Sequence, residues 1–314
     1  MFRYLVKRFL ISIPVLLLAL FATFALLTYI PGSRLGYFPI EGNGDLLDKL
    51  FVALNAPANL LTRYLRYFYN VFVHARFGSI AYHHNLSAEI FRRTGFTLLL
   101  TFCAFLLILL IGIPLGSYSA YKKGSFFDNI VSIVSLFLSS IPPFCLAIFL
   151  AVIFCVRLRL LPVFGFDGPK NMILPTITIG AAGLAKTIQT VRNNVIENLN
   201  KPYVKTLKAK GVRQSRILFV HALKNSLVPT VSIIKEMTAE VFVSTFIAEW
   251  FYAIPGIGYY LLQSVNGRDY DAVLAATTVI TIFILLFGIL SDTLSYSLDP
   301  QLKHSMFKGE GNEQ

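Results

Sequence analysis

Four long stretches without a charged side chain constrain this sequence more than any other feature. They cover residues 9–33, 94–121, 129–156 and 272–291. A helix that crosses a bilayer core of about 30 Å needs about 20 mostly apolar residues, and each stretch meets that length. Only 14% of the residues are charged, against about 25% in soluble domains. The sequence therefore predicts an integral membrane protein. It excludes a disordered chain and, with 3 Cys, a disulfide scaffold.

Two further apolar segments contain charged residues. Lys186 interrupts residues 171–191, and Lys235, Glu236 and Glu240 interrupt residues 226–248. Ionisable groups within a membrane span are costly and normally face a bundle interior or a water-filled cavity. We therefore count both segments as spans and predict an all-α fold with six transmembrane helices.

The distribution of Lys and Arg predicts the orientation of the chain. Cytoplasmic loops carry an excess of both residues, and seven of them lie between Lys201 and Lys224. Both termini are then cytoplasmic. The first apolar stretch exceeds the 7–15 residues of a signal peptide core, which indicates an uncleaved helix. The expected order is a helix within 1–33, an outer loop 34–93 with amphipathic helices, a five-helix core 94–300 and a cytoplasmic tail 301–314.

The basic loop at residues 198–226 is the most informative part of the core. No acidic residue occurs between Glu197 and Glu236. The loop is predicted to form two short helices hinged at Gly211, because glycine adopts the left-handed conformation that ends many helices. A basic loop of this kind either rests on anionic lipid or docks a cytoplasmic partner. The paired amphipathic turns favour docking.

Several motifs give the chain a resemblance to a known family. Residues 203–211 read YVKTLKAKG and residues 221–229 read HALKNSLVP. The chain resembles inner-membrane permease subunits of binding-protein-dependent ABC transporters, of the dipeptide, oligopeptide and nickel class. It is most similar to the B-type subunit, which has a long outer loop after its first helix. Further matching segments, in the family's order, are FGS at 77–79, TL at 97–98, GIPLG at 112–116, AEWF at 248–251, IPGIG at 254–258, RDY at 268–270 and LDP at 298–300.

The resemblance implies two groups of site residues. The expected ATPase-coupling loop contains Tyr203, Lys205, Thr206, Leu207, Lys208, Ala209, Lys210 and Gly211. A second motif follows the fifth helix and contains Glu249, Pro255, Gly256 and Gly258. Leu207 departs from the family, which has a small Ala there.

The resemblance also implies partners and no catalysis in this chain. ATP and Mg²⁺ would bind to two separate ATPase subunits, and the chain itself would hold no cofactor. Residues 180–187 read GAAGLAKT, but Ala185 replaces the glycine that a phosphate-binding loop requires. The other expected partners are a second permease subunit of the C-type, an extracytoplasmic binding protein and membrane lipid, but no nucleic acid. The expected location is the bacterial cytoplasmic membrane, crossed several times.

Lys235, Glu236 and Glu240 lie where the family usually has small or aliphatic residues. Glu236 and Glu240 are four apart and share one helix face. Two interpretations remain open. Lys235 snorkels or pairs with a carboxylate of a neighbouring helix, or the three residues line the translocation pathway, where a zwitterionic peptide would meet both signs of charge.

The outer loop carries an aromatic stripe over residues 60–72, which would lie at the membrane interface or form a platform for the binding protein. His74, His83 and His84 suggest a metal, but further ligands are missing and no metal site is predicted. Cys103, Cys145 and Cys155 fall in predicted spans, where cysteine behaves as a small apolar residue.

The function expected from these features is a permease subunit of an ABC importer for di- or oligopeptides. A nickel or other small-solute permease of the same class is the alternative. A proton-coupled secondary transporter would use Glu236 and Glu240, but the inverted repeats expected of many such transporters are not visible in the sequence. A purely structural subunit of another membrane complex is a third possibility.

Overall fold

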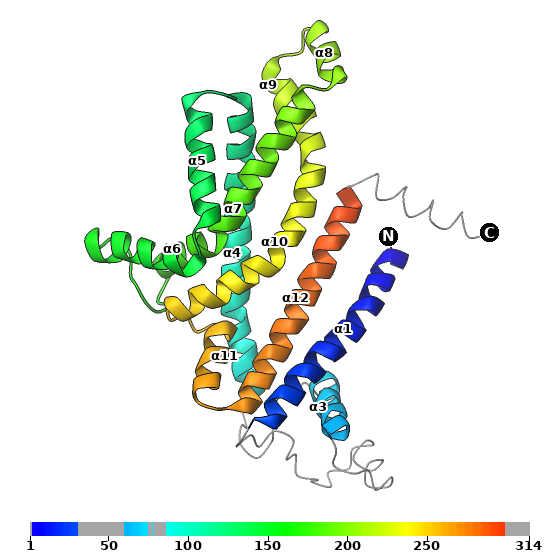
Figure 1. Ribbon diagram of the computed structural model, residues 1–314, viewed down its shortest axis with the longest axis vertical. Helices are drawn as coiled ribbons and strands as arrows, with labels where there is room; N and C mark the ends of the chain where they lie inside the picture. Colours follow the sequence, from blue (N-terminus) through cyan, green and yellow to red (C-terminus); the bar gives the residue numbers. More distant parts are fainter. Residues whose placement is uncertain (1, 31–59, 75–76, 78–85, 299–314) are drawn as a thin grey trace, which may run out of the picture. The chain divides into compact units, whose positions relative to one another are not determined.

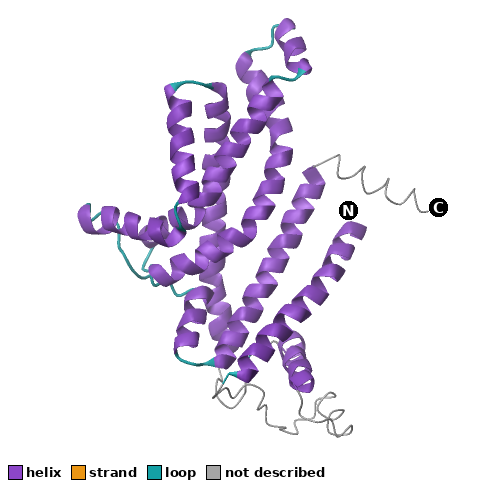
Figure 2. Ribbon diagram, viewed as in Figure 1, coloured by secondary structure: helices purple, strands orange, loops and turns teal. Residues whose placement is uncertain are grey.

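The computed structural model describes residues 2–30, 60–74, 77 and 86–298. Every regular element in this part of the chain is helical, as Figures 1 and 2 show, which confirms the predicted all-α class. The helices are α1 (Phe2–Tyr29), α3 (Leu60–His74), α4 (Leu86–Tyr121), α5 (Phe126–Ser140), α6 (Pro143–Leu150), η1 (Ala151–Arg157), α7 (Lys170–Leu199), α8 (Pro202–Ala209), α9 (Gln214–Arg216), η2 (Ile217–Ala222), α10 (Leu223–Phe251), α11 (Ile257–Asn266) and α12 (Tyr270–Leu298).

Three described helices are long and apolar enough to cross a membrane, and a fourth span results if the bent pair of α5 with α6 and η1 is counted as one. The three are α1, α4 and α12, and they contain the described parts of the stretches 9–33, 94–121 and 272–291. α4 begins at Leu86, within the predicted outer loop 34–93. The two charged segments lie in α7 and α10, which have 30 and 29 residues. Helices of that length reach about 45 Å.

The segment predicted as a span over residues 129–156 is not one continuous helix. The chain bends by 113° between α5 and the segment Pro143–Arg157. Pro142 and Pro143 cause the break, because proline lacks an N–H and pushes the preceding residue out of the helical region. Ile141 accordingly has an extended backbone, with φ −83° and ψ 127°. The lack of charged residues predicted an apolar segment of this length, while the adjacent prolines determine where the segment bends.

The chain divides into two compact units. The first comprises Met1–Arg8, Leu98–Ile254 and Leu286–Gln314, and α7 packs in it against α5, α6 and α10 (Figure 1). Glycines let α4 approach α7 closely. A Cβ at Gly116 would lie 2.7 Å from the backbone oxygen of Ile188 and 2.9 Å from the Val191 Cβ. The GIPLG motif at 112–116 thus serves as a helix contact of the small-residue type that membrane proteins use.

Gly116→Ala is expected to destabilise the first unit by about 1–3 kcal/mol, the usual cost of overpacking. The added methyl meets a backbone oxygen, so α4 must move away from α7. Gly95→Ala on the same helix is the control, because nothing lies within 4 Å of its Cβ position. Thermal unfolding of the two purified variants measures the difference. Equal melting temperatures would contradict the close-contact explanation.

The second unit comprises Phe9–Thr97 and Pro255–Leu285, and α3 is fixed in it by aromatic residues. The Tyr64 hydroxyl donates to the Leu17 backbone oxygen at 2.8 Å, and the Tyr67 hydroxyl lies 2.7 Å from the Thr278 hydroxyl. Phe24 packs 5.9 Å from the Tyr64 ring and 6.0 Å from the Tyr67 ring. Burial raises the pKa of the Tyr67 phenol well above its usual value, so this donor stays protonated.

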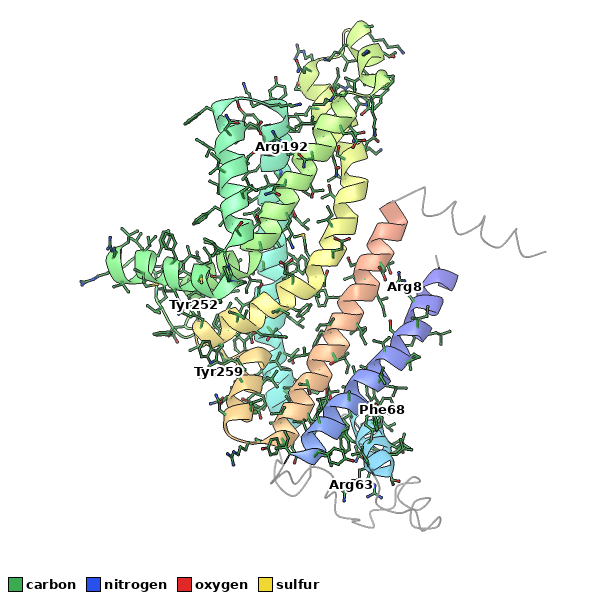
Figure 3. The ribbon with its side chains drawn as sticks, viewed as in Figure 1. Arg8, Arg63, Phe68, Arg192, Tyr252 and Tyr259 are labelled. Atoms are coloured by element: carbon green, nitrogen blue, oxygen red, sulfur yellow. The ribbon has the colours of Figure 1, made fainter. Side chains whose placement is uncertain are left out.

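The predicted aromatic stripe is therefore partly an internal contact. Tyr64, Tyr67 and Val71 are buried, while the other apolar residues of α3, including Phe68 in Figure 3, are half-buried or exposed. The exposed ones are Leu61, Leu65, Phe72 and Val73. The membrane-interface and platform interpretations of this outer face both stay predictions.

Candidate functional site

The basic loop forms one end of the first unit. Figure 1 shows α8 and α9 beyond the ends of α7 and α10. α7 stops at Leu199, and α8 starts at Pro202, which suits the first helical position because it has no N–H to leave unpaired. The loop is thus a helical projection between two long helices.

Gly211 ends α8 in the way its sequence predicts. Its φ is +74°, and its N–H donates to the Lys208 oxygen at 3.0 Å while the Val212 N–H donates to the Leu207 oxygen at 3.1 Å. This pair of bonds is the Schellman motif, which requires a left-handed residue at this position. No atom lies within 4 Å of the place where a Gly211 Cβ would stand. The backbone therefore needs glycine here, although space is available.

The loop presents its charges outward. Lys205, Thr206, Lys208, Ala209, Lys210 and Gly211 are exposed, whereas Tyr203 and Leu207 are half-buried. Val204 is buried and holds α8 on the unit. Leu207, the departure from the family pattern, therefore lies on the inner side rather than among the exposed lysines. The assignment of these residues to ATPase coupling stays a prediction.

The second helix predicted after Gly211 is not a separate short helix. α9 and the π-helical turn η2 lead directly into α10 at Leu223. Ile217 and Leu218 are buried, while Phe219 and Val220 are exposed. Because the apolar residues anchor the segment to the bundle, it continues the long helix and does not break from it.

Two contacts fix the base of the loop. The Asn198 amide, at the end of α7, donates to the Ser226 hydroxyl at 3.0 Å on α10 and to the Asn194 oxygen at 2.9 Å. A buried apolar cluster of Ala120, Val191, Val195 and Leu218 lies on α4, α7 and η2. These contacts tie the base of the loop to both α7 and α10.

A buried ion pair adds a third connection at this end of the unit. Arg192 of α7, labelled in Figure 3, donates from Nε and Nη2 to the two Asp128 carboxylate oxygens at 2.6 and 2.7 Å. The Ser119 hydroxyl and the Gly124 N–H also donate to Asp128, at 2.5 and 2.9 Å. The carboxylate joins α4, the turn, α5 and α7. Sequence reasoning missed this network.

Lys186 and Glu240 form the second charged cluster, on α7 and α10. Their Nζ and Oε2 atoms are 2.5 Å apart, and the two side chains are 44% and 45% exposed. Glu236, one turn from Glu240, is exposed as well. The sequence suggested a pairing with a neighbouring helix for Lys235 and not for Lys186, so this ion pair is a separate observation. The Lys235 side chain lies outside the described part.

The motif that follows α10 places Glu249 in the interior, with no exposed surface. Nearby, the Tyr252 hydroxyl lies 3.2 Å from the Thr178 hydroxyl and 3.3 Å from the Ala147 oxygen (Figure 3). Burial raises the pKa of Tyr252 to about 12, so the phenol keeps its proton. Tyr252 thereby joins the end of α10 to α6 and α7.

The glycines of the same motif serve α11 in the second unit. Gly256 is the N-cap of α11 and has no side chain to cap it. Thr97 on α4 supplies the missing acceptor, because the Ile257 N–H donates to its hydroxyl at 2.9 Å. Pro255, Gly256 and Gly258 therefore lie at a helix start that another helix caps. Asp269 plays the same part for α12 by accepting from the Ala272 N–H at 3.1 Å.

No metal cluster is visible in the described residues: no group of three or more His, Cys, Asp and Glu could hold an ion there. His74 is half-buried, and His83 and His84 lie outside the described part. Cys103, Cys145 and Cys155 are free thiols within or beside apolar helices.

Comparison with known proteins gives a consistent assignment. The sequence profile described as "Binding-protein-dependent transport system inner membrane component" matches residues 112–304, more than half of the chain. The dipeptide transport system permease protein DppB of Bacillus subtilis (strain 168) is 29% identical over 308 residues, covering 96% of this chain and 98% of that protein. The metal-staphylopine import system permease protein CntB of Staphylococcus aureus (strain NCTC 8325 / PS 47) is 28% identical, covering 96% and 99%.

A solved structure supports the fold. An inward-facing conformation of the MetNI methionine ABC transporter matches with a TM-score of 0.53 and 19% identity. The match covers 67% of this chain and 96% of that chain. At this identity the likeness extends to the fold of the helical core alone.

Proposed function

This chain belongs to the family of binding-protein-dependent transport system inner membrane components, and we propose that it carries di- or oligopeptides across the cytoplasmic membrane as one permease subunit of an ABC importer. It is a multi-pass membrane protein and not an enzyme. The single observation that carries the peptide assignment is the near full-length similarity to the dipeptide permease DppB.

The proposed coupling element is the loop over residues 198–226. Exposed Lys205, Lys208 and Lys210 surround the Gly211 stop and offer a basic surface to an ATPase subunit. Asn198 and the Asp128–Arg192 pair tie its base to the long helices. ATP-driven closure of two ATPase subunits would move the loop and, with it, the bundle. ATP and Mg²⁺ belong to those subunits, and a second permease subunit and an outer binding protein complete the assembly.

The proposed topology has six spans and two cytoplasmic termini. α1, α4 and α12 supply three spans, the bent pair of α5 and α6 a fourth, and α7 and α10 the remaining two. The length of α7 and α10 supports their inclusion despite their charges. The basic loop then lies on the cytoplasmic side, as the excess of lysine there requires.

A small-solute permease is the second candidate, because one relative is named for metal-staphylopine import. The deciding experiment is uptake by proteoliposomes that contain the complete transporter, with the binding protein outside. Labelled dipeptide should accumulate only when ATP is inside. Accumulation of a metal chelate instead would favour the second candidate, and uptake by the isolated chain under a proton gradient would refute the ABC assignment.

A further inference from the structure

The charged cluster of Lys186, Glu236 and Glu240 lies near the midpoints of α7 and α10. The two helices pack side by side in the first unit. Lys186 and Glu240 keep almost half of their side-chain surface exposed although they form an ion pair. Glu236 is exposed one turn away on the same helix.

This face cannot lie against lipid. A charge at the centre of a bilayer costs several kcal/mol, so such residues face a bundle interior or a water-filled cavity. An exposed ion pair in a long, mostly apolar helix pair is therefore covered by water or by a partner in the assembled transporter. In the family to which the chain belongs, that surface is a candidate for the route of the cargo.

Glu236 shows that the cluster is more than a structural ion pair. Lys186 already has its carboxylate in Glu240, and Glu236 has no ionic or hydrogen-bond partner among the described residues. Among the described side chains of the cluster, the second carboxylate adds nothing to the pairing of the helices and leaves two carboxylates for one ammonium group. Such a cluster attracts a ligand that brings a cationic group.

The spacing of the charges fits a short peptide. Glu236 and Glu240 are separated by one helical turn, a rise of about 6 Å. An extended dipeptide spans about 7 Å, since each residue contributes at most about 3.6 Å. One end of such a ligand reaches Glu236 while the other end lies beside Lys186.

We propose that Lys186, Glu236 and Glu240 form a binding site in the translocation pathway for a short zwitterionic peptide. The ammonium end binds Glu236, and the carboxylate end binds Lys186, whose three N–H donors allow it to keep a contact with Glu240. This inference rests on the proposed function of peptide import. It assigns a role to Lys186, which the sequence placed only as an exception within a span.

The test uses the complete transporter in proteoliposomes with labelled dialanine as the probe. Glu236→Gln is expected to lower dialanine uptake about tenfold, because a hydrogen bond to a charged group contributes on that scale. The amount of assembled complex should not change, since Glu236 has no partner within the described residues to lose. The double variant Lys186→Gln/Glu240→Gln should lower uptake at least as much.

Asp167→Asn is the matched control. Asp167 is exposed in the loop before α7, outside both the proposed coupling loop and the charged cluster. Its uptake should equal that of the unaltered chain. Unchanged dialanine uptake by Glu236→Gln would overturn the site. Loss of the second permease subunit from the purified variants would also overturn it, since the charges would then hold an interface. If the unaltered transporter shows no ATP-dependent dialanine uptake, the proposed function itself fails.

Discussion

Replacing Gly211 by aspartate is expected to abolish ATP-dependent uptake and the binding of the ATPase subunits, while the variant remains folded in the membrane. Gly211 is exposed in the proposed coupling loop, with φ +74° and no atom within 4 Å of its Cβ position. The subunit alone therefore has room for the side chain. Strain in the left-handed region costs about 1–2 kcal/mol for ordinary residues and less for Asp and Asn.

The expected loss comes from the contact with the ATPase. A carboxylate at Gly211 would stand among Lys208, Lys210 and Arg213, all of them exposed, and would cancel part of the basic surface. It would also separate two surfaces that must pack closely. The measurement is co-purification of the ATPase subunits, followed by uptake in proteoliposomes.

Gly124 offers a matched control on the same unit. It has φ +79°, and like Gly211 it has nothing within 4 Å of its Cβ position. Gly211→Asn and Gly124→Asn therefore introduce the same side chain into the same backbone conformation. We expect Gly211→Asn to lose at least about tenfold in ATPase affinity, or about 1.4 kcal/mol, and Gly124→Asn to lose little. Equal losses in the two asparagine variants would mean that Gly211 matters only for its backbone conformation. Normal uptake by Gly211→Asp would contradict the assignment of this loop to ATPase coupling.

The positions of the long helices could be predicted from the sequence, because each helix depends on its local composition. An uncharged stretch such as residues 94–121 must satisfy its backbone internally in lipid, and a helix does so alone. Gly211 was accessible for the same reason, since the stop it forms involves only residues 207–212. The adjacent prolines at 142 and 143 also predict a break in the helix. The average hydropathy of a long segment does not detect that break, because two prolines barely change the average.

The ion pairs between different helices could not be predicted from the sequence. Lys186 and Glu240 are 54 residues apart, and Asp128 and Arg192 are 64 apart. Helical periodicity shows which residues share a face of one helix, but not the register of that helix against its neighbour. Ser125, three residues before Asp128, is recognisable from the sequence as the N-cap of α5. No sequence signal identified Arg192 as the partner of the Asp128 carboxylate.

The Asp128–Arg192 pair carries the second large expected effect. Asp128→Asn should destabilise the first unit by about 3 kcal/mol, because removal of one partner leaves the other charge uncompensated and partly buried. Asp128 is nearly inaccessible, with 2% of its side chain exposed, and Arg192 retains 24%. Arg192→Gln should cost a similar amount. Thermal unfolding of the purified complex measures both.

A double variant separates the structural role of this pair from its role in coupling. Replacing both residues by leucine removes the two charges together, and buried ion pairs replaced by apolar residues often keep or gain stability. Asp128→Leu/Arg192→Leu should therefore unfold near the temperature of the unaltered complex, unlike either single variant. Lys201→Gln, which removes an exposed pair with Glu197, should shift stability by less than about 1 kcal/mol. If the double variant is stable but imports no peptide, the fixed link from α5 to α7 is required for transmission from the loop. If both single variants unfold at the temperature of the unaltered complex, the pair neither stabilises the unit nor holds the base of the loop.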